Sequence, residues 1–351
     1  MNKVSIFSSR AYASRFLSLK SPEDLCKLLQ IEVQELHLLA ANPDYKTFFL
    51  KKKSGGLREI NSPGDQLALV QRSLTKYLNA VYLTDAHPAV FSFIQKPLFN
   101  QQSENIFSHE HSFFRFPRNI IGNAKKHLGK KMLLNLDLTD FFGSCSANRV
   151  RQVFLRAPFY FEMELATALA LITTYHKKLP AGASSSPVLT NFILLGLDKQ
   201  LNELSISNKI TYSRYADDLS FSAHKNISAK TIQDIRNIIA GNGFSINFKK
   251  FRIQKHTARQ TVTGIKVNTI LNVDRKYIRN LRAVLFNWEK TGILRCSLIY
   301  FSSQPENKNI LIEKFKMMVK GRIEFVGVVK GKNHPVFQKL LLRFEKLQAL
   351  N

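Results

Sequence analysis

The fold follows from one stretch near the middle of the chain, Thr211-Tyr212-Ser213-Arg214-Tyr215-Ala216-Asp217-Asp218-Leu219-Ser220-Phe221-Ser222. β-Branched and aromatic residues run into two adjacent carboxylates, and Leu219 and Phe221 then alternate with serines. This pattern predicts a strand, a tight acidic turn and a second strand. Neighbouring carboxylates repel each other, so their place at a hairpin tip favours a bound cation. An Asp-rich surface turn is the ordinary alternative.

A second stretch of matching character favours the cation. Met132-Leu133-Leu134-Asn135-Leu136-Asp137 is a mostly apolar run of strand length that delivers an acid at its end. Such a run predicts a buried central strand. A carboxylate at the end of a buried strand needs a partner that offsets its desolvation, and a divalent metal ion is such a partner. The sequence therefore predicts that Asp137, Asp217 and Asp218 converge.

Both stretches resemble reverse transcriptases. Tyr215-Ala216-Asp217-Asp218 matches the Tyr-X-Asp-Asp hairpin of that superfamily, and Asp137 stands in the position of its other catalytic aspartate. Further segments agree in order: a basic Lys-Ser-Gly-Gly-Leu-Arg hairpin at residues 53–58, Leu179-Pro180-Ala181-Gly182, and Ile246-Asn247-Phe248-Lys249-Lys250. Each motif alone is weak, but the ordered set covers roughly residues 45–270 and carries the resemblance.

Two other motifs narrow the resemblance to bacterial retron reverse transcriptases. Asn123-Ala124-Lys125-Lys126-His127 is similar to their Asn-Ala-X-X-His signature, and Val262-Thr263-Gly264 is similar to their Val-Thr-Gly signature. The resemblance implies that both elements contact the retron's own RNA. A structural hydrogen-bonded pair is the alternative for Asn123 and His127, which lie about one helical turn apart.

The resemblance implies an α+β chain with the right-hand polymerase fold. A palm built of an antiparallel sheet with packed helices is then expected beside a fingers hairpin and a helical thumb. The fingers hairpin is predicted over Phe48–Ile60, where two strand-like runs flank Ser54-Gly55-Gly56. We expect an N-terminal helical arm over 1–43, fingers and palm over 44–270, and a basic helical thumb over 271–351.

The composition limits the class of protein. The chain of 351 residues carries 52 Lys and Arg against 25 Asp and Glu, a formal net charge of +27. For a folded chain this excess indicates a polyanionic partner such as nucleic acid. Its 3 cysteines are far apart, which fits a reducing cytoplasm and excludes a disulfide framework. No apolar run approaches the ~18 residues of a membrane span, so we expect no membrane partner.

Nucleotide-binding residues are assigned through the resemblance. The basic hairpin would hold the triphosphate of an incoming deoxynucleotide, and a lysine after Phe248 would lie near the leaving pyrophosphate. Phe142 would lie beneath the sugar and clash with a ribose 2′-hydroxyl, although it is also one of 27 phenylalanines that could simply fill the core. Ala181 replaces the usual glutamine, while Gly182 is retained. The assigned set is Lys53, Arg58, Phe142, Gly182 and Lys250.

The C-terminal segment has the pattern of a basic helical unit. Residues 271–351 hold 16 Lys and Arg and 6 Asp and Glu, so 16 − 6 gives a net charge of +10. Over Asp274–Trp288 an apolar stripe predicts a packed helix face beside an arginine stripe that would follow phosphates or face solvent. Gly321, Gly327 and Gly331 are expected to break the next segment before a last helix over Pro335–Leu350. The expected RNA-binding residues are Asn123, His127, Val262, Thr263, Gly264, Arg275, Arg279 and Arg282.

Transfer of a nucleotide to a 3′-hydroxyl suits two Mg²⁺ about 3.5–4 Å apart, which prefer hard oxygen ligands. Asp137 and Asp217 should bridge both ions, and Asp218 should be more peripheral. The resemblance adds the carbonyl of Leu138 as a ligand.

The resemblance also implies the biological role. Retron enzymes copy a cognate structured non-coding RNA from a guanosine 2′-hydroxyl into msDNA, a branched RNA–DNA hybrid. They consume dNTPs and work with a separate effector protein in anti-phage defence. Two alternatives stay open. One is another bacterial reverse-transcriptase relative, of the intron or abortive-infection type. The other is a nucleic-acid-binding scaffold that restrains an effector.

Overall fold

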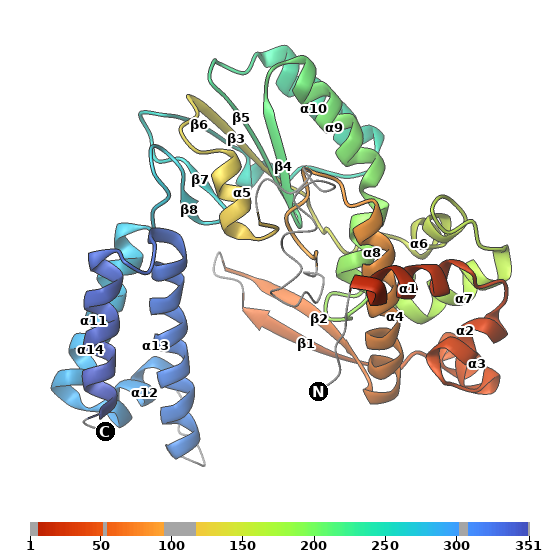
Figure 1. Cartoon of the computed structure of the whole chain (residues 1–351), viewed down its shortest axis with the longest axis horizontal. Helices are drawn as coiled ribbons and strands as arrows, with labels where there is room; N and C mark the ends of the chain where they lie inside the picture. Colours follow the sequence, from red (N-terminus) through yellow and green to blue (C-terminus); the bar gives the residue numbers. More distant parts are fainter. Residues whose placement is uncertain (1–5, 52–54, 95–116, 302–307, 350–351) are drawn as a thin grey trace.

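The structure is a computed structural model of the whole chain, and it describes residues 6–51, 55–94, 117–301 and 308–349. It confirms the predicted α+β class, with helices around small antiparallel sheets. Figure 1 shows the N-terminal helices at one end of the molecule and helices α11 to α14 at the opposite end. The N-terminal helices are α1 (Ile6–Leu17), α2 (Pro22–Leu29) and α3 (Val33–Ala41).

The predicted fingers hairpin is confirmed as β1 (Tyr45–Lys51) and β2 (Leu57–Pro63), which pair in antiparallel register. The backbone N–H of Asn61 in β2 donates to the carbonyl of Ala181 at 2.8 Å. Gly182 lies against the same strand, because a Cβ added there would stand 2.7 Å from the Asn61 carbonyl oxygen. Its φ of +137° is also one that other residues rarely adopt. The glycine therefore lets the hairpin pack closely on the 179–182 turn.

Among the described residues, a four-stranded antiparallel sheet in the order β4-β5-β3-β6 forms the centre of the molecule. Its strands are β3 (Met132–Asp137), β4 (Thr211–Tyr215), β5 (Asp218–Ala223) and β6 (Arg252–Lys255). The two strands predicted around the acidic turn and the strand predicted to end at Asp137 are thereby confirmed. In the register of β3 and β5, Asp137 is the partner of Asp218.

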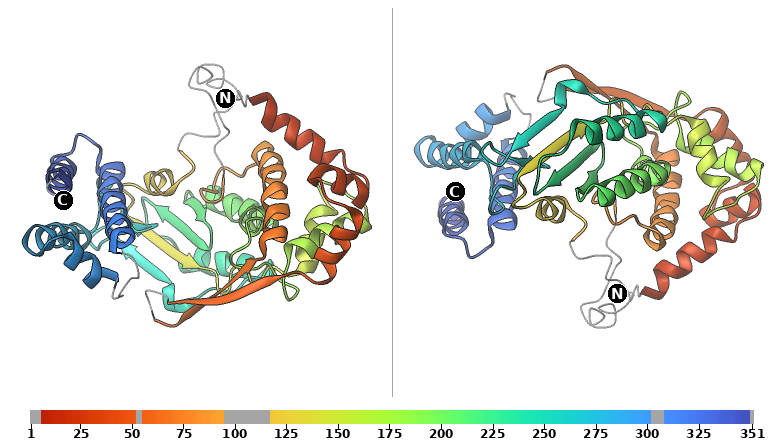
Figure 2. Two further views of the ribbon diagram at one scale, coloured as in Figure 1. Left: turned by 90° about the horizontal axis from the view of Figure 1, so that it is seen from below. Right: turned by 90° about the horizontal axis from the view of Figure 1, so that it is seen from above.

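The larger hydrophobic core joins the N-terminal helices to the sheet. Phe16 and Leu25 from the first helices belong to the same buried cluster as Leu134 of β3 and Phe221 of β5. The other helices of this core are α4 (Asp65–Thr84), α6 (Ala147–Phe154), α7 (Met163–Thr173), α8 (Ser186–Ile193), α9 (Leu195–Ser207) and α10 (Ala229–Gly241). Figure 2 shows this body from below and from above. The helices α1 to α3 of the proposed arm 1–43 therefore pack on the body through buried side chains such as Phe16 and Leu25.

A second core lies toward the C-terminus. It is built from α11 (Arg275–Thr291), α12 (Ile293–Phe301), α13 (Lys308–Lys330) and α14 (Pro335–Ala349). The predicted apolar stripe is buried there at Leu281, Leu285 and Trp288. This core also takes side chains from α5 (Ile120–Lys126), β7 (Thr261–Val262) and β8 (Ile265–Lys266). Packing therefore crosses the boundary that we propose at residues 270 and 271.

One expectation about the C-terminal segment was wrong. Helix α13 runs unbroken through Gly321 and Gly327, and it ends only before Gly331, whose φ is +99°. A Cβ added at Gly327 would stand 2.6 Å from the ring of Phe337 in α14. The glycine therefore serves close packing between two helices, a tertiary reason that outweighs its low helix propensity. In the described ranges, no helix has the length and apolar character needed to cross a membrane.

A buried ion pair holds β4 against α9. Arg214 of β4 forms a two-pronged contact with Asp198 of α9, at 2.8 Å from Nε and 2.7 Å from Nη2, and both side chains are fully buried. The hydroxyl of Tyr212 donates to the same carboxylate at 2.7 Å. Paired, hydrogen-bonded charges are tolerated in a protein interior, whereas an unpaired one is costly.

We expect Arg214→Met to lower the free energy of unfolding of the full chain by about 3–5 kcal/mol, because it leaves Asp198 as an uncompensated buried charge. Urea unfolding followed by circular dichroism measures the change. Glu289→Gln is the matched control, since it removes one partner of the more exposed pair with Arg343 and should have a small effect. Equal effects of the two substitutions would contradict this assignment.

Candidate active site

The structure brings the three predicted acids together at one end of the central sheet. Asp137 ends β3 opposite Asp218, and directly paired residues on antiparallel strands have Cα atoms about 4.5–5.5 Å apart. The backbone N–H of Leu138 donates to the carbonyl of Asp217 at 3.0 Å. Asp137 is 4% exposed, Asp217 is half-buried and Asp218 is exposed. The three acids therefore lie near one another, as the sequence predicts, while their roles as metal ligands stay a prediction.

The acidic turn is fixed by contacts from distant parts of the chain. Ala216 has a left-handed φ of 56°, and its N–H donates to the hydroxyl of Ser92 at 2.6 Å. Arg214 donates to the Ala216 carbonyl at 3.3 Å and to the side chain of Asn191 at 3.1 Å. Asn191 in turn donates to the carbonyl of Ser92 at 3.1 Å. The turn is thus held by a closed set of buried polar groups.

Sequence reasoning did not find these supporting residues. Ser92, Asn191 and Asp198 carry no motif, and only the rarity of polar residues inside apolar helices marked Asn191 and Asp198. Their partner Arg214 sits inside a strand that sequence alone described as β-branched and aromatic.

Asp137 is neutralised by a lysine in this structure. The ammonium of Lys250 lies 2.6 Å from one carboxylate oxygen of Asp137, and the side-chain amide of Asn247 donates to the other at 3.2 Å. The backbone N–H of Asn247 also donates to the Asp137 carbonyl at 2.8 Å. The hydrogen bond to Asp137 raises the pKa of Lys250. The segment after Phe244 therefore places the positive charge of Lys250 beside the acids. Lys250 is the residue to which we assign contact with the leaving pyrophosphate.

The pKa values of both carboxylates of the turn, Asp217 and Asp218, are raised. Burial, together with the charge of Asp137, raises the pKa of Asp217, while Lys250 and Arg58 lower it. The pKa of Asp218 rises to about 7, chiefly because neighbouring protein atoms desolvate its carboxyl group. The charges of Asp217 and Asp137 add to this rise. A bound cation would remove the repulsion that causes part of both shifts.

The donor chemistry fits a divalent cation, because carboxylate oxygens are the hard ligands that Mg²⁺ prefers. As the side chains stand in the described part of the chain, no three acids, histidines or cysteines are grouped to hold a metal ion. Lys250 and Asn247 instead occupy the two oxygens of Asp137. A metal at Asp137 would therefore require Lys250 to move away.

The predicted nucleotide-binding residues are distributed around the acids. Arg58 is exposed on β2, and its charge acts on Asp217. Phe142 is half-buried, with its ring 5.2 Å from Phe141 and 6.5 Å from Phe93. Gly182 packs on the fingers hairpin as described above. Lys53 lies outside the described residues. These assignments remain predictions.

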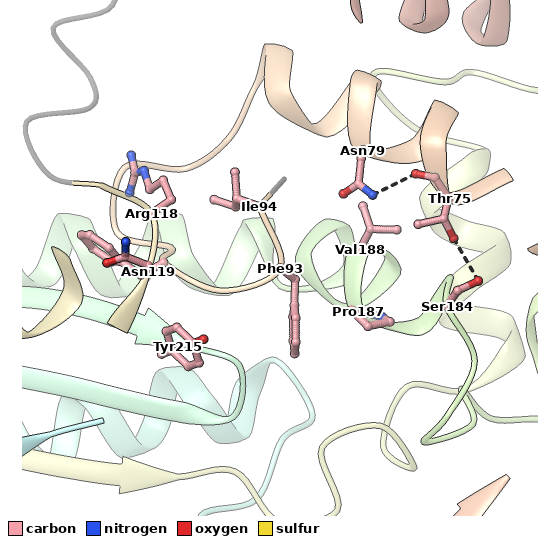
Figure 3. A pocket seen from close by; sticks show the side chains of 11 residues that line it. Thr75, Asn79, Phe93, Ile94, Arg118, Asn119, Ser184, Pro187, Val188 and Tyr215 are labelled. Carbon is pink, nitrogen blue, oxygen red and sulfur yellow. Dashed lines mark hydrogen bonds between the residues drawn. The ribbon is translucent and has the colours of Figure 1, made fainter. Parts of the chain in front are cut away.

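A pocket of ≈ 370 Å³ opens beside Tyr215 of the turn. Figure 3 shows Tyr215 and Arg118 on one side and Thr75, Asn79 and Val188, which come from α4 and α8, on the other. The hydroxyl of Thr75 donates to the carbonyl of Gln71 within α4 at 2.6 Å and lies 3.4 Å from the hydroxyl of Ser184. The pocket thus combines an aromatic ring with polar groups directly next to the acidic turn.

The retron-type motifs lie largely inside the protein. Asn123 and His127 are 1% and 0% exposed and are hydrogen-bonded inside the protein, so the alternative of an internal pair describes them better than RNA contact. Val262 is also buried, at 1% exposed. Thr263 donates to the carbonyl of Ile120 at 3.3 Å, and Gly264 occupies the turn with a φ of +80°. The side chains of Asn123, His127 and Val262 are thus enclosed by protein in this structure.

The arginine stripe lies on the surface. Arg275, Arg279 and Arg282 are all exposed on α11, as the helical pattern predicted. The arrangement leaves them accessible to phosphates, and their role in RNA binding stays a prediction.

Comparison with known families agrees with this geometry. The family model described as "Reverse transcriptase (RNA-dependent DNA polymerase)" matches residues 50–267. The chain belongs to the reverse transcriptase family. The match includes β3, the acidic turn and the segment that carries Lys250.

The similar curated proteins place it among the bacterial retron reverse transcriptases. Retron Ec86 reverse transcriptase of Escherichia coli is 29% identical over 334 residues, covering 93% of this chain and 90% of that protein. Retron Ec73 reverse transcriptase of Escherichia coli is 30% identical over 63% of this chain and 68% of that protein.

Retron Mx65 reverse transcriptase of Myxococcus xanthus is 29% identical over 76% of this chain, but the chain spans only 62% of that relative's length. Among solved structures, the apo telomerase of Candida tropicalis aligns with a TM-score of 0.44 at 12% identity, covering 86% of this chain and 61% of that chain.

The raised pKa of Asp218 predicts a pH-dependent cost in the metal-free protein. Its pKa rises from 3.8 to about 7, so the folded state keeps a proton that the unfolded state has lost. The stability that this proton confers is complete below pH ~4 and is lost as the pH rises through about 7. In EDTA, Asp218→Asn should therefore match the unmodified protein near pH 4 and be more stable at pH 8.

Urea unfolding at a series of pH values measures this difference, and added Mg²⁺ should narrow it by neutralising the acids. A variant that is less stable than the unmodified protein at pH 8 in EDTA would contradict the predicted repulsion.

Proposed function

We propose that the protein is an RNA-directed DNA polymerase of the retron type. The observation that carries the proposal is the convergence of Asp137 with Asp217 and Asp218 at one end of the sheet. Three carboxylates in this arrangement, in a member of the reverse transcriptase family, suit nucleotidyl transfer. The substrates would be dNTPs, and the template would be RNA.

The chain's own residues divide the work. Asp137 and Asp217 would hold two Mg²⁺, with Asp218 and the Leu138 carbonyl at the edge of the site. When bound, the ions would supply an activated 3′-oxygen and neutralise the charge that develops on the leaving pyrophosphate. Arg58 is exposed on the fingers hairpin, and its charge lowers the pKa of Asp217. It would therefore hold the triphosphate.

Lys250 has a role at both stages. Before the metal binds, its ammonium pairs with Asp137 at 2.6 Å. With a metal ion held by Asp137, the Lys250 ammonium would be free of this pair and would be placed beside the acids to bind the leaving pyrophosphate. Because η3 (Phe248–Lys250) is a short turn with Lys250 exposed, this movement needs no rearrangement of the sheet.

The retron character determines the proposed partners. The relatives are retron reverse transcriptases by name, which supports a cognate structured non-coding RNA as template and a guanosine 2′-hydroxyl as primer. The product would be msDNA, and a separate effector protein would join the complex in the cytoplasm as part of anti-phage defence. The exposed arginines of α11 and the net charge of +27 provide the basic surface that such an RNA needs.

We expect Asp137→Asn or Asp217→Asn to reduce primer extension by about a thousandfold or more, because each change removes a ligand of ions that contribute several kcal/mol. Binding of RNA should persist, since the basic surface is unchanged. Primer extension on an RNA template and filter binding at a fixed salt concentration measure the two effects. RNA that copurifies with the unmodified protein should release DNA when it is treated with debranching enzyme. RNA from the two variants should release none.

Asp85→Asn is the matched control, because Asp85 is an exposed acid at the end of α4 and is not one of the three convergent acids. Normal DNA synthesis by the Asp217→Asn variant would refute the proposed site.

The position of Phe142 predicts how the enzyme selects deoxynucleotides. We expect Phe142→Ala to raise the use of ribonucleotides relative to deoxynucleotides by about 10- to 200-fold, the range that one hydrophobic contact in a pocket can set. Single-nucleotide incorporation with dNTP and rNTP measures the ratio. Phe286→Ala on α11 removes an exposed ring far along the chain and serves as the control. An unchanged ratio would mean that Phe142 only fills the core.

A further inference from the structure

A buried hydrogen-bonded set connects α5 to the hairpin that carries the acidic turn. The imidazole of His127 lies between two serine hydroxyls, at 2.7 Å from one through Nδ1 and 2.6 Å from the other through Nε2. The second hydroxyl donates to a side-chain amide oxygen on α5 at 2.5 Å. All of these side chains are at most 1% exposed. We call the set the brace, and its members are Asn123, His127, Ser213 and Ser222.

The brace has one consistent direction. The amide oxygen of Asn123 can only accept, so the hydroxyl of Ser213 donates to it and must itself accept from Nε2–H of His127. Nδ1 is then the acceptor for the hydroxyl of Ser222. The Ser213 contact requires a proton on Nε2, and in a neutral imidazole this leaves Nδ1 as an acceptor. Burial and the charges of two nearby lysines lower the pKa of His127 to about 3, which keeps it neutral at physiological pH.

The brace and the buried ion pair grip opposite faces of the same strand. Successive side chains of a strand point to opposite faces, so Ser213 lies on the α5 side while Tyr212 and Arg214 lie on the α9 side. Figure 1 shows β4 between α5 and α9. Ser213 is two residues before Tyr215, where the acidic turn begins, and Ser222 lies on the returning strand. Both strands of the hairpin are thus tied to α5.

The same helix also belongs to the C-terminal core. Ile121 and Ala124 of α5 pack in the cluster that contains Leu281 and Leu285 of α11. The carbonyl of Ile120 accepts the hydroxyl of Thr263 in the turn between β7 and β8. One short helix therefore contacts the hairpin of the acidic turn through polar groups. Its apolar side chains pack beside β7 and β8 in the core that also holds the C-terminal helices.

We propose that the brace is a positioning element that sets the place of the acidic turn relative to the C-terminal helices, and that its members make no direct contact with RNA. The inference rests on the proposed polymerase function for its kinetic consequence. Its structural consequence, the rigidity of the hairpin, is independent of that function. A network that is fully satisfied rigidifies its surroundings, and loss of one partner leaves a buried polar group unpaired.

Two substitutions separate the halves of the brace. His127→Gln can keep a donor near Nε2 but loses the acceptor for Ser222, whereas His127→Asn can keep that acceptor but loses the contact with Ser213. Both should speed amide hydrogen–deuterium exchange in the peptide 211–223 of the full chain, measured by mass spectrometry. His256→Gln is the matched control, because His256 is exposed. If neither His127 variant folds, Ser222→Ala removes one hydroxyl and serves instead.

Kinetics and RNA binding distinguish positioning from direct contact. With a homopolymer RNA template and a DNA primer, kcat should fall by about 10- to 100-fold, the loss typical of misplaced catalytic groups, while KM for dNTP changes little. The dissociation constant of the copurified RNA should stay unchanged. The homopolymer carries no retron-specific structure, so a loss of rate on it cannot come from lost recognition.

Three results would overturn the inference. RNA affinity that falls while hairpin exchange stays normal would mean direct RNA contact. Unchanged exchange with unchanged kcat would mean that the brace holds nothing that matters for the turn. Faster exchange with unchanged kcat would show a structural tie without a positioning role. If the unmodified protein synthesises no DNA on any template, the proposed function fails, and the exchange experiment still judges the brace.

Discussion

The buried contacts on the two faces of β4 are the constraint on which the candidate site depends. Desolvation is the largest cause of the raised pKa values of Asp217 and Asp218, and repulsion between the neighbouring carboxylates adds to it. A flexible turn would relieve it by swinging the acids apart. Here the Arg214–Asp198 pair fixes one face, and the His127 contacts fix the other. Buried polar contacts thus hold an unfavourable arrangement of charges in place.

Charge in the rest of the chain has the complementary sign. A net charge of +27 would by itself make the compact state repel itself, and much of it is carried at the surface, for example by the arginines of α11. Asp137, Asp217 and Asp218 lie together at one end of the central sheet, and Lys250 neutralises part of their charge. A basic exterior around an acidic centre suits a protein whose ligand is a polyanion that must meet cations at one point.

Local patterns were enough to predict most of the fold. The hairpin around Asp217 and the strand ending at Asp137 follow from the alternation and apolar runs of neighbouring residues. The continuous α13 did not follow, because Gly327 is explained by a ring on another helix. In the site, the acids were predictable by motif, whereas Ser92, Asn191 and Asp198 were not, because each acts only through tertiary contacts.

The Asn-Ala-X-X-His motif shows how far the surroundings of a motif depend on tertiary contacts. Sequence spacing placed Asn123 and His127 on a common helix face, and that placement is what the structure has. What spacing cannot supply is the identity of the surface opposite that face. The two serines that fill it come from β4 and β5, 86 and 95 residues further along the chain. Because the same helix packs in the C-terminal core, we propose that the motif acts on the acidic turn through contacts within the protein.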